Sequence, residues 1–303
     1  MAELSVKIAG VEFKNPIIAA SGCFGFGEDY EELYPVERLG GISLKGTTLE
    51  PRPGNPPVRI AETPSGILNS VGLQNPGVDA LVREHLPRIK GKNTVVIANI
   101  AGSTVESCGE AVRRACVDGI DMIELNISCP NVREGGIAFG VREESVKRVV
   151  SEVRSVCTKP LIVKLSPNVT DIVSIARVAE AAGADALSLI NTLLGMRIDI
   201  ETRRPVLRNN MGGLSGPAVF PVALRMVWQV ARAVDIPVIG LGGVSSWKNA
   251  VEMLLAGACA VQVGTAMFTD PTSPLDIIDG LERWMDRNGI ERVEDIVGKA
   301  EEW

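Results

Sequence analysis

Eight short apolar segments, most of them followed by a stretch with helical character, constrain the fold of this chain more than any other feature. Each is rich in β-branched residues and ends in small or polar ones, which is typical of buried strands. Eight such strands alternating with helices are the number needed for a closed parallel barrel. A doubly wound sheet is the alternative, but the GxGxxG turn expected after its first strand is absent. The segments are residues 16–22, 40–48, 94–102, 122–128, 160–166, 186–192, 237–243 and 260–266.

The composition is compatible with one domain that spans residues 1–303. A chain of 303 residues fits either two average domains or one α/β barrel. Hydrophobic residues make up 46% of the chain, and neither a low-complexity linker nor a break in composition divides it. We therefore predict a single α/β domain with the (β/α)8 TIM-barrel fold.

The N-terminal residues and the longest connections between the predicted strands are expected at the two ends of the barrel. Residues 4–16 predict a β-hairpin around Ala9 and Gly10, which would close the N-terminal end. Long loops in a compact domain are often functional, so we expect the three longest connections at the C-terminal face, as active-site loops. These connections are rich in Gly, Pro and Asn and comprise residues 49–76, 129–140 and 193–215.

Two of the intervening helices have recognisable ends. Thr104 is a suitable N-cap for a helix over 105–118, in which apolar residues recur at helical spacing. A second helix is predicted to follow Asp171, to run over 172–182 and to stop at Gly183.

Charge and cysteine content exclude several classes of protein. A net charge of -6 and a pI near 5.1, without any basic run, argue against a nucleic-acid or anionic-membrane binder. No apolar stretch approaches the roughly 20 residues of a membrane helix, and the N-terminus has no signal-peptide pattern. The six cysteines form no CxxC pair and lack metal-ligand spacing with the only histidine, His85. We expect a cytoplasmic, reduced protein without a metal site, and a small anionic substrate remains compatible with it.

Polar residues and glycines cluster at the carboxyl ends of the predicted strands, where barrels of this type place their active sites. Glycines end both of the last two strands, which favours a phosphate site over simple tight turns. The residues at these ends are Ser21, Lys45, Asn99, Asn126, Ser128, Cys129, Lys164, Asn191, Thr192, Gly242, Gly243, Gly264 and Thr265.

Two lysines and several asparagines give this end of the barrel its chemistry. Lys45 and Lys164 come from different strands, and one cation there would suit a reduced flavin while the other would suit a carboxylate. The alternative for each lysine is that it extends to solvent past the strand end. Asparagine matches the alternating donors and acceptors of an imide or pyrimidine, although any single one is more often a turn residue. The candidate asparagines are Asn69, Asn126, Asn131 and Asn191.

Cys129 is the candidate catalytic base. It follows the fourth strand, and its loop contains Gly135 and Gly136 as hinge residues for closure over a substrate. A free thiol has a pKa near 8.5, which a neighbouring cation can bring into the working range. The usual base is absent, because His85 lies in a helical stretch away from the strand ends. The competing interpretation is a small buried hydrophobe, which we assign to Cys108, Cys116, Cys157 and Cys259.

Motifs along nearly the whole chain closely resemble those of the dihydroorotate dehydrogenases. They are NPIIAASG, SLKGTTLEPRPGNPP, GILNSVGLQNPG, ELNISCPN, IVKLSPN, LINT, GGLSGPA, IGLGGV and VQVGTAMF. The resemblance implies a flavoprotein that binds FMN and oxidises dihydroorotate to orotate in pyrimidine biosynthesis. It implies an FMN site made of Ser21, Lys45, Gly46, Asn99, Asn126, Lys164, Ile190, Gly216, Gly242, Gly243, Gly264 and Thr265. It implies a dihydroorotate site made of Lys45, Asn69, Ser70, Val71, Gly72, Leu73, Asn126, Asn191 and Thr192.

The same resemblance implies a mechanism and a partner. Cys129 would take the C5 proton while hydride passes from C6 to flavin N5. Membrane-associated members use serine as base and carry an N-terminal membrane segment, and this chain shows neither feature. Residues 21–41 and the GNPP run at 54–57 resemble the NAD-linked class 1B group. That group pairs with an electron-transfer subunit that carries FAD and a 2Fe–2S cluster, with a homodimer core inside a heterotetramer.

Three alternatives remain open at this stage. The nearest is the fumarate-reducing homodimeric dihydroorotate dehydrogenase, which also uses cysteine. A dihydropyrimidine dehydrogenase-like flavin barrel would have less use for Lys45, because its substrate lacks a carboxylate. An inactive barrel that serves as a binding scaffold would be colourless. Cys23 and Gly46 stand where the resemblance leads us to expect Thr and Ala, and we assign no chemistry to the difference.

Overall fold

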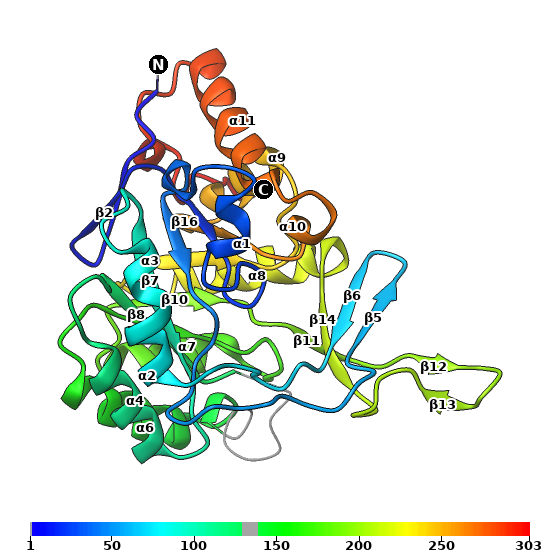
Figure 1. The fold of residues 1–303 in the computed structure, drawn as a ribbon. Coiled ribbons are helices and arrows are strands. Elements are labelled where there is room, and N and C mark those ends of the chain that lie inside the picture. The colour runs from blue at the N-terminus through cyan, green and yellow to red at the C-terminus, as the bar shows by residue number, and fades with distance from the viewer. Residues whose placement is uncertain (1, 129–138) are drawn as a thin grey trace.

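A closed barrel of eight parallel strands forms the centre of the computed structural model, which describes residues 2–128 and 139–303 (Figure 1). Every predicted segment contributes one strand, and β16 closes the barrel by pairing Val263 with Ala19 of β3. The predicted (β/α)8 fold is therefore confirmed. The strands are β3 (Ile17–Ala19), β4 (Gly41–Ser43), β7 (Val95–Ile100), β8 (Met122–Asn126), β9 (Leu161–Lys164), β10 (Ala186–Leu189), β15 (Val238–Leu241) and β16 (Ala260–Val263).

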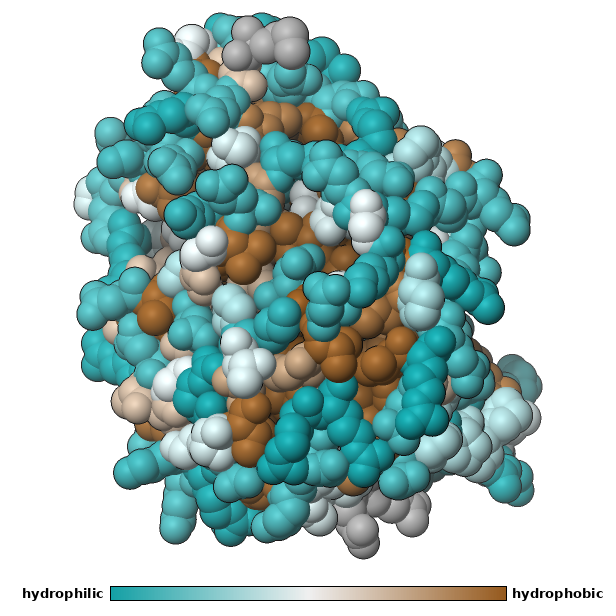
Figure 2. Space-filling view, turned by 60° about the vertical axis from the view of Figure 1, so that its left-hand side comes forward, coloured by the Kyte–Doolittle hydropathy of each residue, from teal (hydrophilic) through white to brown (hydrophobic). Residues whose placement is uncertain are grey.

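Helices surround the barrel and bury their apolar faces against it. The longer ones are α4 (Val105–Ala115), α6 (Glu143–Val156), α7 (Ile172–Ala181), α8 (Phe220–Ala231), α9 (Trp247–Leu255) and α11 (Ser273–Asn288). Shorter ones are α1 (Glu28–Glu31), α2 (Val78–Ala80), α3 (Leu86–Ile89) and α10 (Ala266–Thr269), with a π-helical turn at Leu81–His85. Hydrophilic side chains cover much of the face turned forward in Figure 2, with smaller apolar areas between them.

The helix predicted over 105–118 is shorter than expected. Thr104 caps it as predicted, by accepting the backbone N–H of Ser107. The helix ends at Ala115 because Cys116 leaves the helical region, with φ -76° and ψ 61°. The chain then turns towards β8 through Gly119, whose φ of 96° is one that glycine adopts without strain.

Asp171 caps α7, as the sequence predicts, and this cap supports a stability prediction. Its Oδ1 atom accepts the backbone N–H groups of Val173 at 2.9 Å and Ser174 at 3.2 Å. We expect Asp171→Ala to lower the free energy of unfolding by about 0.5–2 kcal/mol, because two helix-end donors lose their acceptor. Urea denaturation would measure the change, and Asp171→Asn, which keeps an acceptor, should lose less. Equal stability of Asp171→Ala and the unsubstituted protein would contradict the role of this cap.

The predicted N-terminal hairpin lies at the bottom of the barrel. Strands β1 (Val6–Ile8) and β2 (Val11–Phe13) pair antiparallel around Ala9 and Gly10. Phe13 is fully buried against Gly41 at the start of β4, where a Cβ atom would lie 2.8 Å from the Phe13 ring. The hairpin therefore closes the N-terminal end, as expected.

Two of the long connections contain a second sheet that the sequence does not reveal. Strands β5 (Ile60–Thr63) and β6 (Gly66–Asn69) form a hairpin, and β6 pairs with β14 (Gly212–Ser215). With β11 (Leu193–Gly195), they form a four-stranded antiparallel sheet in the order β11-β14-β6-β5. A further pair, β12 (Ile198–Asp199) and β13 (Arg204–Pro205), extends away from the barrel as an arm (Figure 1).

Candidate active site

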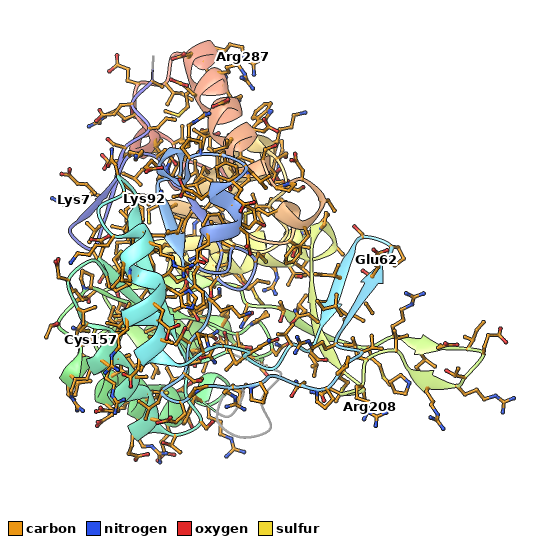
Figure 3. The ribbon with its side chains drawn as sticks, in the orientation of Figure 1. Lys7, Glu62, Lys92, Cys157, Arg208 and Arg287 are labelled. Atoms are coloured by element: carbon orange, nitrogen blue, oxygen red, sulfur yellow. The ribbon has the colours of Figure 1, made fainter. Side chains whose placement is uncertain are left out.

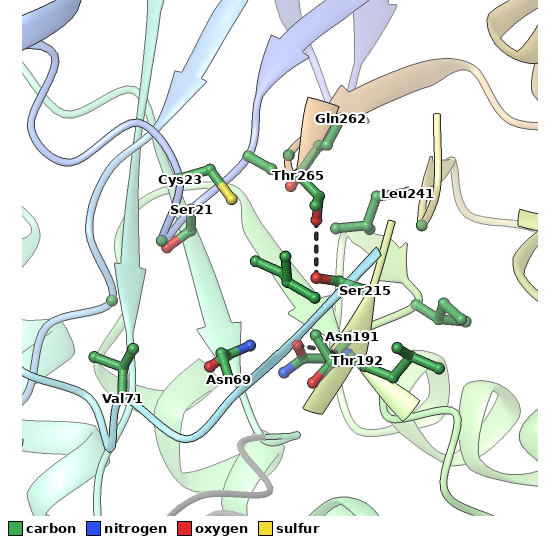
Figure 4. A pocket seen from close by; sticks show the side chains of 18 of the residues that line it. Ser21, Cys23, Asn69, Val71, Asn191, Thr192, Ser215, Leu241, Gln262 and Thr265 are labelled. Carbon is green, nitrogen blue, oxygen red and sulfur yellow. Dashed lines mark hydrogen bonds between the residues drawn. The ribbon is translucent and has the colours of Figure 1, made fainter. Parts of the chain in front are cut away.

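A cavity of about 250 Å³ opens at the carboxyl ends of the barrel strands, beneath the second sheet. Both layers contribute side chains, such as Lys164 from β9 and Asn69 from β6. In Figure 4, Asn69 lies between Val71 on one side and Asn191 and Thr192 on the other, while Ser21, Cys23 and Thr265 lie above them.

Most of the residues that the sequence proposes for the site line this cavity. They are Ser21, Lys45, Gly46, Asn69, Val71, Gly72, Leu73, Asn126, Lys164, Ile190, Asn191, Thr192, Gly242, Gly243, Gly264 and Thr265. Three others do not line it. Asn99 and Ser70 are buried behind the wall, and Gly216 lies beside Gly243. The structure brings the set together, and the individual binding roles stay predictions.

Glycine is required at one corner of the cavity. Gly243 has a φ of 74°, and a Cβ atom there would lie 2.8 Å from the carbonyl oxygen of Gly216. A side chain at this position would be strained and would collide with backbone. Close by, the Thr265 hydroxyl donates a hydrogen bond to Ser215 Oγ at 2.8 Å (Figure 4). This corner thus presents backbone and hydroxyl groups, which suit an anionic group such as phosphate.

Asparagine side chains that line the cavity are held by hydrogen bonds. The Ser128 hydroxyl donates to Asn126 Oδ1 at 2.9 Å, and Asn191 Nδ2 donates to Ser128 Oγ at 2.7 Å. Asn69 Nδ2 contacts the Gly213 carbonyl at 3.4 Å. Their remaining donors and acceptors suit a planar ligand with alternating N–H and C=O groups.

The predicted base Cys129 lies outside the described residues, as do Asn131, Gly135 and Gly136. Its role stays a prediction. The described chain stops at Ser128, which is 1% exposed and bonded to two residues that line the cavity. His85 is elsewhere, stacked on Phe26 and paired with Glu28 at 2.9 Å.

A buried carboxylate beneath the cavity is the main feature that the sequence reading missed. Glu124 lies inside the barrel and is fully buried. Burial alone would raise its pKa, but Lys164 and hydrogen bonds from neighbouring side chains hold the pKa of the Glu124 carboxyl below its usual value. A single acidic residue within the apolar run MIELN was the available signal.

The described cysteines away from the cavity include one close pair. Cys116 and Cys157 follow α4 and α6 with their Sγ atoms 3.8 Å apart. Cys157 is at the opposite side of the molecule from Glu62 of β5 (Figure 3). Cys108 and Cys157 are buried as expected, whereas Cys116 and Cys259 are only partly buried.

Cys116 should react with thiol reagents before Cys108. The hydrogen bond with Cys157 lowers the pKa of the Cys116 thiol to about 6, while burial raises that of Cys108 to about 12. The thiolate is the reactive form, so Cys116 should react faster than Cys108 at pH 7, and its reaction should slow as the pH falls and the thiolate is protonated. We expect iodoacetamide to label Cys116 first at pH 7 and much more slowly at pH 5, as read by peptide mass mapping. Unchanged labelling between the two pH values would contradict this.

The described residues contain neither a cluster of metal ligands nor a membrane-spanning helix. Within residues 2–128 and 139–303, no group of three or more His, Cys, Asp or Glu side chains could hold a metal ion. Over the same part of the chain, no helix is long and apolar enough to cross a membrane.

Comparison with known proteins identifies the family. The family model for dihydroorotate dehydrogenase matches residues 3–285. The chain belongs to the dihydroorotate dehydrogenase family. It is 55% identical to a protein of Bacteroides thetaiotaomicron over 99% of this chain and 100% of the relative. It is 56% identical to a protein of Parabacteroides distasonis, over 98% of each chain. Both relatives are named dihydroorotate dehydrogenase B (NAD(+)), catalytic subunit.

A solved structure supports the fold independently. A crystal structure of DHODH from Eimeria tenella, in complex with ferulenol, superposes with a TM-score of 0.83. The match covers 98% of this chain and 88% of the other at 24% identity, so it bears on the fold alone. The resemblance seen in the motifs is thus confirmed at the level of family. Membership makes the chain an oxidoreductase and implies a flavin cofactor, FMN, in this subunit.

Proposed function

We propose that the cavity binds FMN together with (S)-dihydroorotate and that the protein oxidises this substrate to orotate in the synthesis of pyrimidine nucleotides. The observation that carries this proposal is the convergence of two lysines and three asparagines on one cavity at the strand ends. Family membership supports the reaction type, and the contents of the cavity support the substrate class. Residues 1–303 would form one catalytic domain.

The residues present fit FMN. The side-chain oxygen of Asn99, behind the wall, is buried without a hydrogen-bond partner, and Gly242 and Gly243 line the cavity without side chains. Ser21, Lys164, Ile190, Gly264 and Thr265 would complete the flavin site. When bound, FMN supplies the two-electron acceptor for the hydride from C6.

The chain itself would position the substrate and remove the proton. Asn69, Asn126, Asn191 and Thr192 offer the donors and acceptors that a dihydropyrimidine ring needs. Lys45 would pair with the substrate carboxylate, and Cys129 would take the C5 proton. A dihydropyrimidine without a carboxylate is the competing substrate. Lys45→Ala should therefore weaken dihydroorotate binding, and unchanged apparent affinity would favour that competitor.

The electrons would pass to NAD through a partner. Relatives that are 50–56% identical carry NAD(+) and catalytic subunit in their names, which supports a second subunit for this chain. We propose that this partner carries FAD and a 2Fe–2S cluster and joins a homodimer of this chain in a heterotetramer. An acceptor assay on the isolated chain tests this: rapid turnover with fumarate would instead favour the fumarate-reducing type.

An absorbance spectrum of the purified chain tests the proposal most directly. A bound flavin that bleaches on anaerobic addition of dihydroorotate is the expected result. A flavin that stays oxidised would move the substrate to another reduced pyrimidine or carbonyl compound. A folded protein that cannot be reconstituted with FMN would overturn the proposal and favour an inactive scaffold.

A further inference from the structure

A polar layer lies inside the barrel directly below the cavity, at a level where such barrels usually carry branched apolar side chains. Its centre is the Glu124 carboxylate, which accepts four hydrogen bonds. Two come from the hydroxyl groups of Ser43 at 2.9 Å and Ser188 at 2.8 Å. The other two come from side-chain amides, Asn99 at 2.5 Å and Gln262 at 2.8 Å. These donors lie on four different strands, so hydrogen bonds to the carboxylate connect β8 with β4, β7, β10 and β16 inside the barrel.

The carboxylate also decides which way the two amides face. An ionised carboxylate can only accept hydrogen bonds, so each amide must turn its NH₂ group towards Glu124. The two carbonyl oxygens then face away, and both are buried without a hydrogen-bond partner. Gln262 lines the cavity, and Asn99 Oδ1 lies 3.0 Å from where a Cβ atom of Gly46, another lining residue, would be. Glu124 thus fixes the amide of Gln262, which lines the cavity, and the amide of Asn99, which lies behind the cavity wall.

The same carboxylate balances the charge of a lysine that lines the cavity. Lys164 is 4% exposed, and its Nζ atom lies 3.8 Å from Glu124 Oε2. The pair therefore adds no net charge to the floor of the cavity, although the lysine alone would add one positive charge.

We propose that Glu124 is a positioning residue for the flavin: it fixes the amide of Gln262 at the cavity and that of Asn99 behind the wall, and it offsets the charge of Lys164. The inference rests on the proposed FMN site. It extends that site to a residue that does not line the cavity. A purely structural ion pair would stabilise the barrel without affecting the flavin, so the flavin's own properties distinguish the two roles.

The test compares Glu124→Gln with the unsubstituted protein, each purified and reconstituted with FMN. Loss of one negative charge near the flavin should favour the anionic reduced form by about tenfold over the oxidised form. For a two-electron couple this corresponds to a midpoint potential higher by about 30 mV. Because the new amide also releases the orientation of Asn99 and Gln262, oxidised FMN should dissociate about tenfold more readily. Spectroelectrochemical titration and fluorescence titration of the FMN-free protein give the two values.

Three variants complete the design. Glu124→Asp keeps the charge and should leave the potential close to that of the unsubstituted protein. Gln262→Leu removes one amide without changing the charge and should weaken FMN binding. If Glu124→Gln does not fold, this variant still tests the role of the Gln262 amide in FMN binding. Glu110→Gln, on the surface of α4 beside Arg114, is the matched control and should change neither value.

The outcomes separate this inference from the proposed function. An unsubstituted protein that binds no FMN would overturn the function. If it binds FMN, while Glu124→Gln matches it in both potential and affinity, Glu124 is structural only and the inference fails. Unchanged affinity in Gln262→Leu would overturn the role of that amide.

Discussion

Replacement of Cys129 by alanine should lower the turnover of dihydroorotate at neutral pH by roughly 10²–10⁴-fold, the usual effect of removing a general base. No other base is apparent: within the described part of the chain, no other cysteine or histidine at the cavity takes its place. Cys23 lines the cavity, but burial raises the pKa of its thiol to about 11, so it stays protonated. His85 stacks on Phe26 and pairs with Glu28, and it does not line the cavity.

The measurement is the rate of flavin reduction by dihydroorotate in stopped flow, which excludes later electron transfer. FMN content should be unchanged, because no residue of the proposed flavin site is altered. Cys116→Ala removes a thiol outside the cavity and serves as the matched control, with an expected rate close to that of the unsubstituted protein. A rate for Cys129→Ala within a few-fold of the unsubstituted protein would remove Cys129 from the mechanism.

The barrel was predictable because its strands are buried on both faces. Such strands are continuous apolar runs, for example VVIAN in β7 and LIVK in β9, and these runs stand out from the amphipathic helices between them. The cavity followed from the barrel, since the ends of parallel strands meet on one face. Three proposed residues do not line it. Ser70 and Gly216 were assigned through the motifs, and Asn99 through its place at a strand end, and neither kind of evidence carries information about depth.

The second sheet was not predictable in the same way. Its strands contain three or four residues, and β6 pairs with a strand about 145 positions later, as in Leu68 with Leu214. Short strands rich in glycine have weak periodicity, and sequence alone does not reveal such distant pairing. Gly66 shows why this connection contains glycine: a Cβ atom there would lie 2.0 Å from the Ser215 carbonyl oxygen. The glycines that suggested a loop are therefore required for two strands to approach closely.

Glu124 could have been found from the alternation of side chains along a strand. Residues two apart face the same side, so a cavity residue at Asn126 places Glu124 on the barrel interior. A charge in that position needs a partner, and Lys164 of the next strand is paired in register with Asn126. The hydroxyl and amide donors could not be assigned, because their distances depend on the closed geometry of the barrel.

Glu124→Ala should cause the largest loss of stability among the substitutions considered, about 3–5 kcal/mol in the free energy of unfolding. The reason is the charge left behind rather than the bonds removed. Lys164 would remain buried without the carboxylate at 3.8 Å, and the amides of Asn99 and Gln262 would lose their acceptor. Leaving one member of a buried pair uncompensated costs more than replacing both members by apolar groups.

The double variant Glu124→Ala/Lys164→Met tests this reason. It removes both charges, so it should recover part of the stability that Glu124→Ala loses, although it makes a further change to the barrel. Urea denaturation of FMN-free preparations keeps cofactor affinity out of the comparison. Additive losses in the double variant would mean that Lys164 does not depend on Glu124. In that case the low pKa of the carboxyl would have to come from its hydrogen bonds alone, and the polar layer would stabilise the barrel without balancing charge at the cavity floor.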